Sequence, residues 1–538
     1  MLRKHARDPL ETAFRHACHS AMFEGREWRV LAQMIPYPNW LNPGDNTWQL
    51  VAATLVGLMS VPGIAVLYGG LVQKKWAINT MMMAFSAFSL VLVVWVLWAF
   101  NMGFGHPLGG SSGAGPISLS NFFHNFVGKP HPIVSHFGEQ NQEVLPEGTS
   151  IPFHFPTSTF AYFQFVFAAI TPLLFLGSVV SRIKFKAWLV LVPLWTTFVY
   201  AVNAFLLWGG GWFAQRGALD YSGGYVIHLS AGVAGFVTAW VIGPRLKRDR
   251  EHAVPNNLLF VMVGAGILWL GWNGFNGGDP YYAGADAAAA VLNTNLATAS
   301  ALLTWVFMDM SFSKQRKPTF LGAVNGMIVG LVTITPAAGW VDGYGALLMG
   351  VIASSIVWLA WTYLPKVRPF SKVDDALGVV YTHGMAGLAG GLLLGLFADP
   401  GMVEYIGTGK TPSFTATGFF YSGSWHQFWW QLLAALWVIV YTAVVTFVLL
   451  KIVKFLVRGL REPDEVLETG DLAIHDEEAY PAGDLAERVS AFAMAGVGSG
   501  RSEEEDERTE PRRQLSPVAS SQEADPFTVG GTAGRPLS

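Results

Sequence analysis

The sequence predicts an all-α membrane protein with eleven transmembrane helices, and its composition and the length of its apolar stretches are the main reasons. Hydrophobic residues make up 52% of the 538 residues and charged residues only 13%, against about 25% in soluble proteins. The stretches between charged clusters reach about 20 apolar residues, enough for a helix to cross a hydrocarbon core of about 30 Å. Glycine (59 residues) and tryptophan (21 residues) are abundant, as is typical of closely packed helices that reach the membrane interfaces.

The composition also excludes other kinds of site. The single cysteine, Cys18, rules out intrachain disulfides and cysteine-based metal or redox sites. The net charge of −3 gives no sign of nucleic-acid binding. The N-terminal region lacks the apolar core of about 7–15 residues that a signal peptide needs, so the first span is expected to direct membrane insertion.

Eleven apolar stretches are expected to form the spans, and the loops between them predict the orientation. One set of loops, with the segment after the last span, holds nineteen Lys and Arg residues, whereas the loops on the opposite side hold only Lys129, Arg216 and Lys410. The six basic residues of the N-terminal extension are a local exception, and most of them lie about 20 or more residues from the first span, where charge counts for less. The positive-inside rule then predicts an N-terminus outside and a C-terminus in the cytosol. The spans cover about residues 48–72, 79–104, 158–181, 187–212, 223–243, 257–276, 286–309, 318–336, 341–364, 375–398 and 425–457.

Three regions are expected along the chain: an extracellular extension at 1–43, a transmembrane domain at 44–460 and a cytosolic tail at 461–538. The extension has no assigned role. The loop at about 105–157 is rich in Gly, Pro, Ser and His and is expected to be irregular. The later part of the tail is polar, with an acidic run at 503–507, a composition typical of disorder.

A repeated pattern is the most informative feature of the chain. The pattern is an Asp, seven residues, a His, two residues, Ala-Gly, one residue and a second Ala-Gly. It begins first at Asp220, with His228, and again at Asp375, with His383. A smaller echo is Ile-Thr-Pro at 170–172 and at 334–336. The two copies fall on the fifth and tenth spans, which predicts two five-helix repeats plus a final helix. Because five is odd, the repeats must have inverted topology, as in many transporters.

The repeat predicts that His228 and His383 meet near the middle of the membrane. Eight residues place each histidine about 12 Å deeper than its aspartate. The glycines four and seven positions later share a helix face with the histidine and allow a close helix contact. Two imidazoles there can exchange a proton through their ring nitrogens. One alternative is that the histidines form a purely structural hydrogen bond between helices. The other is that both histidines ligate a haem, and the small residues beside both histidines disfavour this second alternative.

Four segments resemble hallmark stretches of the Amt/Mep/Rh ammonium transporter family, most closely the second of its two plant clades. The resemblance covers about residues 44–480 and implies a homotrimer with one narrow hydrophobic pore per subunit. It further implies a plasma-membrane transporter, not an enzyme, that needs no cofactor and carries ammonium or ammonia and methylammonium across the lipid bilayer. The segments are GDNTWQLVAATLVGLMSVPGIAVLYGGL (44–71), DYSGGYVIHLSAGVAG (220–235), WLGWNGFNGGDP (269–280) and VDDALGVVYTHGMAG (373–387).

The resemblance assigns roles to seven residues. They are the pore twin histidines His228 and His383, the phenylalanine gate Phe167 and Phe275, and the outer recruitment site Trp208, Phe163 and Asp220. In the implied mechanism, aromatic faces hold the cation at the mouth. Neutral ammonia then passes the gate, the histidines relay the proton, and potassium is rejected because it has no proton to lose.

The chain also departs from the family pattern. Asp279 stands where bacterial relatives have a serine that helps to bind the recruited ion. The stretch 459–480 resembles the family's regulatory C-terminus, which docks on the neighbouring subunit, but Ala473 replaces the threonine that is phosphorylated in the first plant clade. Two alternatives stay open: an ammonium sensor that signals through its tail (462–538), and a membrane-embedded haem oxidoreductase.

Overall fold

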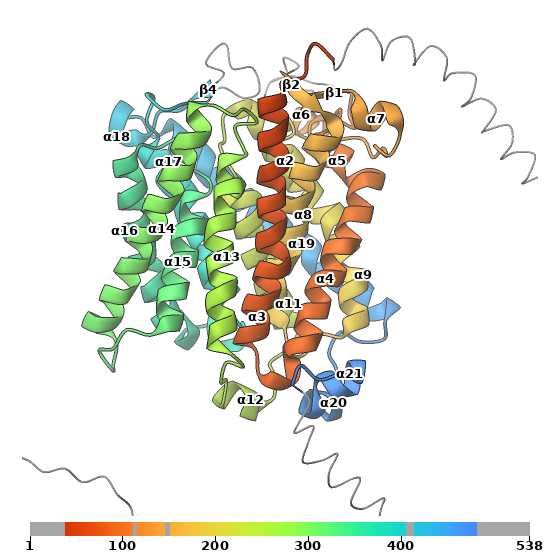
Figure 1. Ribbon diagram of the computed structural model, residues 1–538, viewed down its shortest axis with the longest axis vertical. Helices are drawn as coiled ribbons and strands as arrows, with labels where there is room; N and C mark the ends of the chain where they lie inside the picture. Colours follow the sequence, from red (N-terminus) through yellow and green to blue (C-terminus); the bar gives the residue numbers. More distant parts are fainter. Residues whose placement is uncertain (1–37, 111–114, 116, 146–150, 405–413, 481–538) are drawn as a thin grey trace, which may run out of the picture. The chain divides into compact units, whose positions relative to one another are not determined.

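The computed structural model describes residues 38–110, 115, 117–145, 151–404 and 414–480, and most of these residues belong to long helices (Figure 1). Most of the predicted N-terminal extension and the tail beyond residue 480 lie outside the described residues. Within them, ten helical segments are long and apolar enough to cross a membrane. They are built from α2 (Pro43–Leu58) with α3 (Ala65–Leu71), α4 (Ala77–Val94) with α5 (Phe100–Phe104), α8 (Thr157–Val179), α9 (Phe185–Trp195) with α10 (Ala201–Leu207), η6 (Gly224–Leu229) with α11 (Ser230–Ile242), α13 (Leu258–Gly277), α14 (Ala285–Phe312), α16 (Gly343–Tyr363), η9 (Val380–Met385) with α17 (Ala386–Phe397), and α19 (His426–Leu456).

The predicted span at 318–336 is a shorter helix, α15 (Phe320–Ile334). Its 15 residues rise about 22 Å at 1.5 Å per residue, less than a hydrocarbon core of about 30 Å. The helix stops because Pro336 has no backbone N–H to continue it, and residues 335–340 form turns. The structure therefore supports a helical membrane protein with ten helices of spanning length, and the eleventh span stays a prediction.

Several spans contain a turn of π-helix. Such turns are rare in proteins and occur frequently at functional sites. Two of them, η6 and η9, carry His228 and His383 and lead directly into α11 and α17. The π-helical turns are η1 (Met59–Ile64), η3 (Trp95–Ala99), η4 (Thr196–Tyr200), η6 (Gly224–Leu229) and η9 (Val380–Met385).

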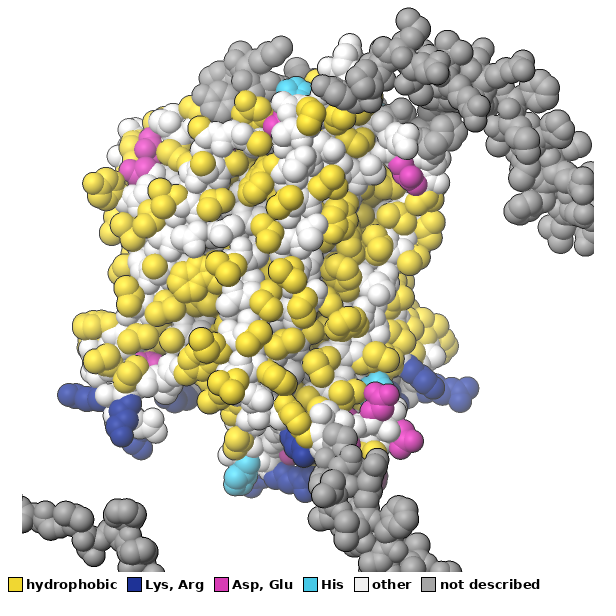
Figure 2. Space-filling model, viewed as in Figure 1, with side chains coloured by type: hydrophobic (Ala, Val, Ile, Leu, Met, Phe, Trp, Pro, Cys, Tyr) yellow, Lys and Arg dark blue, Asp and Glu magenta, His cyan; other side chains and the backbone are white. Residues whose placement is uncertain are grey.

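The two ends of the helical bundle differ in structure and in charge. One end, the hairpin end, carries short helices and two small antiparallel hairpins (Figure 1). The other, the basic end, carries α12 (Lys247–Glu251), α20 (Asp464–Thr469) and α21 (Asp471–His475), and Figure 2 shows the Lys and Arg side chains gathered there. The elements of the hairpin end are α6 (Leu119–His124), α7 (His136–Gln140), β1 (Gln142–Leu145), β2 (Ile151–Pro156), β3 (Val403–Glu404), β4 (Phe414–Thr415) and α18 (Phe419–Ser422).

The loop at 105–157 is more ordered than predicted. Strands β1 and β2 pair within it, so the described residues are not all helical. The rings of Phe153 and Phe155 stack at 5.2 Å between centroids, and Phe153 also stacks on Phe160 of α8 at 5.2 Å. Burial of these aromatic side chains orders a segment whose Gly and Pro content by itself indicates an irregular loop.

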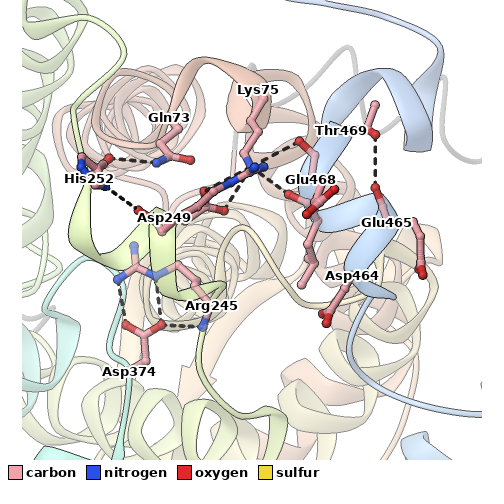
Figure 3. Close-up of polar contacts among 12 residues, drawn as sticks. Gln73, Lys75, Arg245, Asp249, His252, Asp374, Asp464, Glu465, Glu468 and Thr469 are labelled. Carbon is pink, nitrogen blue, oxygen red and sulfur yellow. Dashed lines mark hydrogen bonds and ion pairs between the residues drawn. The ribbon is translucent and has the colours of Figure 1, made fainter.

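Ion pairs tie the helix ends together at the basic end (Figure 3). Arg245 donates to both carboxylate oxygens of Asp374, at 3.0 and 2.8 Å, and its backbone N–H donates at 2.7 Å. The fully buried Arg182 donates to the Asp374 carbonyl. Burial lowers the pKa of Arg182 to about 10, so this side chain stays protonated at neutral pH. These bonds fix the segment that precedes η9 and its histidine.

The described part of the tail packs against the same end. Lys75 forms an ion pair with Asp249 at 3.1 Å and donates to the Leu467 carbonyl at 2.8 Å (Figure 3). Asp471 accepts from two backbone N–H groups at the start of α4, at 2.8 and 2.9 Å. His475 contacts the Asn79 side chain through Nε2 at 3.0 Å. Residues 464–475 are therefore held on the helices of their own chain.

Candidate functional site

The two copies of the repeated motif adopt the same local structure. Asp220 caps η6, where its Oδ2 accepts from two backbone N–H groups at 3.0 and 2.9 Å. Asp375 caps η9 in the same way, at 3.2 and 2.8 Å. Both aspartates thus satisfy free N–H groups at a helix start. Burial raises the pKa of Asp220 to about 7, although the hydrogen bonds from these N–H groups lower that pKa.

His228 and His383 meet in the interior of the bundle. Their Nδ1 atoms are 3.2 Å apart, and their ring centroids lie 5.3 Å apart at an interplanar angle of 24°. Both residues are buried, at 0% and 4% exposed. One Nδ1 must donate and the other accept, so the pair shares a proton position between the rings. Two nitrogen ligands on opposite sides of one metal ion, as the axial ligands of a haem are, would lie about 4 Å apart if each bond is about 2 Å long, so the 3.2 Å spacing does not fit such a pair.

Glycines let the two histidine helices touch. A Cβ on Gly232 would lie 2.2 Å from the Cα of Gly384, and a Cβ on Gly387 would lie 2.5 Å from a backbone oxygen of η6. The close contact predicted for the glycines four positions after each histidine is therefore present. The glycines seven positions after, Gly235 and Gly390, face α8 and α15 instead.

A line of aromatic rings leads from the hairpin end to the histidines. Phe167 contacts Trp208 edge to face, with centroids 6.3 Å apart, and Phe163 at 4.8 Å. Phe167 and Phe275 lie 4.4 Å apart at an interplanar angle of 33°. Phe275 then stacks on His228 at 6.0 Å. The three phenylalanines are fully buried, so this line is closed in the present conformation.

Trp272 belongs to the same line, although it was not among the predicted site residues. Its ring stacks on His228 with centroids 5.3 Å apart and an interplanar angle of 16°. Its Nε1 donates to the Thr335 hydroxyl at 2.9 Å, which fixes the ring. The signal in the sequence is its position three residues before Phe275, because residues three apart share a helix face.

A cavity of about 450 Å³ reaches His383 from the basic end. His383 lines it together with Tyr68, Trp361, Asp375 and Tyr381. His383 can therefore exchange protons or a small ligand with this cavity, whereas the Nε2 of His228 is buried without a partner among the described residues.

A second cavity, of about 180 Å³, lies at the hairpin end and is here called the hairpin-end cavity. Its lining includes Trp208, Asp220, Asp279, Tyr281 and Glu404. The Trp208 Nε1 donates to the Asp220 carbonyl at 2.5 Å, which holds the indole beside the aromatic line. Burial raises the pKa of Asp279 and of Glu404 well above their usual values. The cavity thus combines an aromatic side chain with buried acidic groups.

The structure brings the seven predicted site residues into one continuous arrangement. Trp208 and Asp220 line the hairpin-end cavity, whereas Phe163 lies buried behind it, against Phe167 and Gly278. Sequence reasoning missed Glu404 because it lies in the two-residue strand β3, and no motif indicates that this strand passes the cavity.

Comparisons with known proteins agree on one family. A family model described as Ammonium Transporter Family matches residues 47–480. Ammonium transporter 3 member 2 of Oryza sativa subsp. japonica is 49% identical over 445 residues, which cover 82% of this chain and 90% of that protein. Ammonium transporter 2 of Arabidopsis thaliana is 45% identical over 445 residues, covering 82% and 89%. The crystal structure of Saccharomyces cerevisiae Mep2 superposes with a TM-score of 0.65 and 30% identity, over 79% of this chain and 91% of that one.

Proposed function

The chain belongs to the Ammonium Transporter Family, and we propose that it moves ammonium across the membrane along the aromatic line that ends at His228 and His383. The observation that carries this proposal is the continuity of the route. Trp208 lines the hairpin-end cavity, Phe167 and Phe275 close the way inward, and His383 opens on the cavity of the basic end. The relatives named above are ammonium transporters, which favours transport over a sensor.

Recruitment comes first. The Trp208 ring attracts a cation by its π face, and Phe163 and the Asp220 carboxyl group lie close by. Phe167 and Phe275, at 4.4 Å, leave no passage and must rotate for a substrate to pass. A small neutral molecule crosses such an apolar gate at far lower cost than an ion, because burial of an unpaired charge is expensive.

The histidine pair supplies the polar contacts beyond the gate. Ammonia can form a hydrogen bond with an imidazole nitrogen. The proton that the ammonium ion gives up can pass separately between the two Nδ1 atoms, which are 3.2 Å apart, toward the basic-end cavity. Potassium has no proton to give up, so this scheme excludes it. A haem between the rings is disfavoured because the nitrogens are in direct contact.

We propose the following arrangement in the membrane. The basic end faces the cytosol, in keeping with the positive-inside rule and the Lys and Arg side chains gathered there (Figure 2). This places the N-terminus outside and requires α15 to act as the eighth of eleven spans, in two inverted five-helix repeats and a final helix. Protection of a C-terminal tag from protease added to intact cells tests the orientation.

We further propose that the chain forms homotrimers in the plasma membrane, each subunit with its own pore. The family resemblance supports this assembly, and light scattering of the detergent-solubilised protein measures its mass. Fluorescence of a tagged chain tests the location.

The transmembrane domain at 44–460 then bears the transport activity, and the tail from 461 regulates it. The tail docks through Asp471, and loss of its two hydrogen bonds costs about 1 kcal/mol, as for a helix cap. Limited proteolysis of Asp471→Ala is expected to cut residues 464–475 faster than in the wild type. An unchanged cleavage rate would contradict this docking.

Uptake in cells that lack their own ammonium transport tests the proposed function. Cells that express the chain are expected to take up ammonium and labelled methylammonium saturably, without competition from potassium. Truncation after Tyr480 separates transport from signalling, because a sensor would lose its output while a transporter would retain uptake. No uptake above that of control cells, with the protein present at the surface, would refute transport.

A further inference from the structure

A pocket of about 540 Å³ opens on the surface of the bundle at the basic end, and it is here called the α11 pocket. Phe236 and Trp240 of α11 line one side of it. Arg368 and Lys372, in the segment between α16 and η9, line the other side. The pocket shares no lining residue with the two cavities of the proposed route, so transport along that route assigns it no role.

Aromatic rings form the apolar side of the α11 pocket. The Trp240 ring stacks on Phe447 of α19, with centroids 6.0 Å apart and an interplanar angle of 26°. Phe236 contacts Phe370 edge to face, with centroids 5.6 Å apart. Trp240 is 56% exposed although it belongs to a helix of spanning length. An exposed tryptophan near the end of such a helix is typical of the boundary between hydrocarbon and lipid headgroups.

Basic side chains lie beside these rings. Arg368 and Lys372 are both exposed and line the pocket. Lys451 of α19 places its Nζ over the Phe447 ring, 4.9 Å from the centroid. Because Phe447 also stacks on Trp240, Lys451 belongs to the same aromatic and basic surface. An arginine guanidinium can bond to two oxygens of one phosphate and a lysine adds a compact charge, so this surface favours a phosphate group.

An exposed apolar strip of α19 leads to these charges. Val444 and Val448 are 57% and 49% exposed. They share a helix face with Lys451, because the three positions follow one another at spacings of four and three residues. A molecule that covers both the strip and the basic side chains must be apolar at one end and negatively charged at the other. An anionic phospholipid has this chemistry, whereas a free anion would use only the charges and leave the aromatic side of the pocket unfilled.

We propose that the α11 pocket binds one anionic phospholipid of the membrane leaflet at the basic end. Arg368 and Lys372 hold its phosphate group. The rings of Phe236 and Trp240 pack against its glycerol and the upper part of an acyl chain, which continues along the exposed strip of α19. Lys451 adds a third positive charge beside the headgroup. The site is separate from the transported substrate, so it does not depend on the transport function proposed above.

Lipid binding by the purified full-length chain in detergent tests the proposal. Native mass spectrometry with phosphatidylglycerol, and with phosphatidylcholine of the same acyl chains, measures the Kd of the first lipid bound to each chain. Phosphatidylglycerol is expected to bind about tenfold more tightly, which corresponds to ~1.4 kcal/mol, because the choline cation of the other lipid is repelled by the basic side chains.

Two double variants locate this preference. Arg368→Gln, Lys372→Gln removes both charges of the pocket and is expected to bind the two lipids equally. Arg368→Lys, Lys372→Arg keeps both charges and is expected to keep the preference for phosphatidylglycerol. Because both side chains are exposed, each variant is expected to unfold at the wild-type temperature when no lipid is added, which separates lost binding from lost folding.

Arg316→Gln, Lys317→Gln is the matched control, because it removes one Arg and one Lys from exposed positions in the loop between α14 and α15. Its preference for phosphatidylglycerol is expected to equal that of the wild type. Equal affinity of the wild type for the two lipids would overturn the proposed site. An unchanged preference in Arg368→Gln, Lys372→Gln, or the same loss of preference in the control variant, would also overturn it.

Two other occupants of the pocket are tested in the same assay. Inorganic phosphate is expected not to displace phosphatidylglycerol, and displacement would overturn the proposal by showing a site for free anions. The tail carries an acidic run at 503–507, so the chain truncated after Tyr480 is compared with the full chain. Equal binding by both supports a lipid site, whereas binding by the truncated chain alone would identify the tail as the occupant and overturn the proposal.

Discussion

Replacement of Gly232 by alanine would place a methyl group where the two histidine helices touch. The new Cβ would lie 2.2 Å from the Cα of Gly384 and 2.5 Å from its backbone nitrogen. Both atoms belong to the backbone, so no side-chain rotation relieves the clash. Ordinary contact begins at 3.4 Å, which requires the helices to separate by about 1 Å, and overpacking of this kind costs about 1–3 kcal/mol.

That separation acts directly on the histidine pair. The Nδ1 atoms of His228 and His383 are 3.2 Å apart, and a further 1 Å or so takes them past hydrogen-bond range. Methylammonium uptake per molecule at the surface is expected to fall about tenfold, which corresponds to ~1.4 kcal/mol at the barrier. Thermal unfolding in detergent is expected to show a parallel loss of stability.

Gly266→Ala is the control for this experiment. Gly266 lies in α13, and a Cβ there would meet nothing within 4 Å, so uptake and stability are expected to match the wild type. Wild-type uptake by Gly232→Ala would refute the reasoning, because it would show that transport does not depend on the contact between the two rings.

Two further changes test other parts of the site. Trp272→Ala removes the ring that stacks on His228, and it is expected to lower the free energy of unfolding by about 3–5 kcal/mol and to abolish most of the uptake. Trp240→Ala is the control, because Trp240 is 56% exposed, and it is expected to leave stability and uptake unchanged. Equal effects of the two variants would contradict this role of Trp272. Asp374→Asn breaks the ion pair with Arg245 and is expected to cost about 3 kcal/mol at neutral pH. Burial raises the pKa of Asp374, but the hydrogen bonds and charge of Arg245 outweigh burial and hold that pKa below 3.8. The ionised pair therefore stabilises the fold above pH 3.8, and the difference in unfolding temperature between wild type and Asp374→Asn is expected to shrink as the pH falls below that value; a constant difference would contradict the ion-pair account.

The sequence predicted most of the arrangement around His228 and His383 because its repeated motif carries information on geometry. The matched motifs that begin at Asp220 and Asp375 predicted two equivalent helices, and the glycines four positions after each histidine predicted the close contact that brings His228 and His383 together. These features are local along the chain, so periodicity and motif spacing are enough to reveal them.

Other features depend on contacts between distant segments. Glu404 reaches the hairpin-end cavity from a two-residue strand, and no local pattern indicates where that strand lies. The hairpin of β1 and β2 is ordered by aromatic packing on α8, against the local preference of a Gly- and Pro-rich loop. The end of α15 depends on where the chain turns at Pro336, and hydropathy alone placed that boundary two residues too late.

The most direct test of the central claim is ammonium flux into liposomes that contain the purified protein, with wild type compared with the His228→Ala, His383→Ala double variant. The wild type is expected to give saturable flux that potassium does not support. The double variant, reconstituted to the same density, is expected to lose that flux. Flux equal to the wild type in the double variant would contradict a route through the histidine pair.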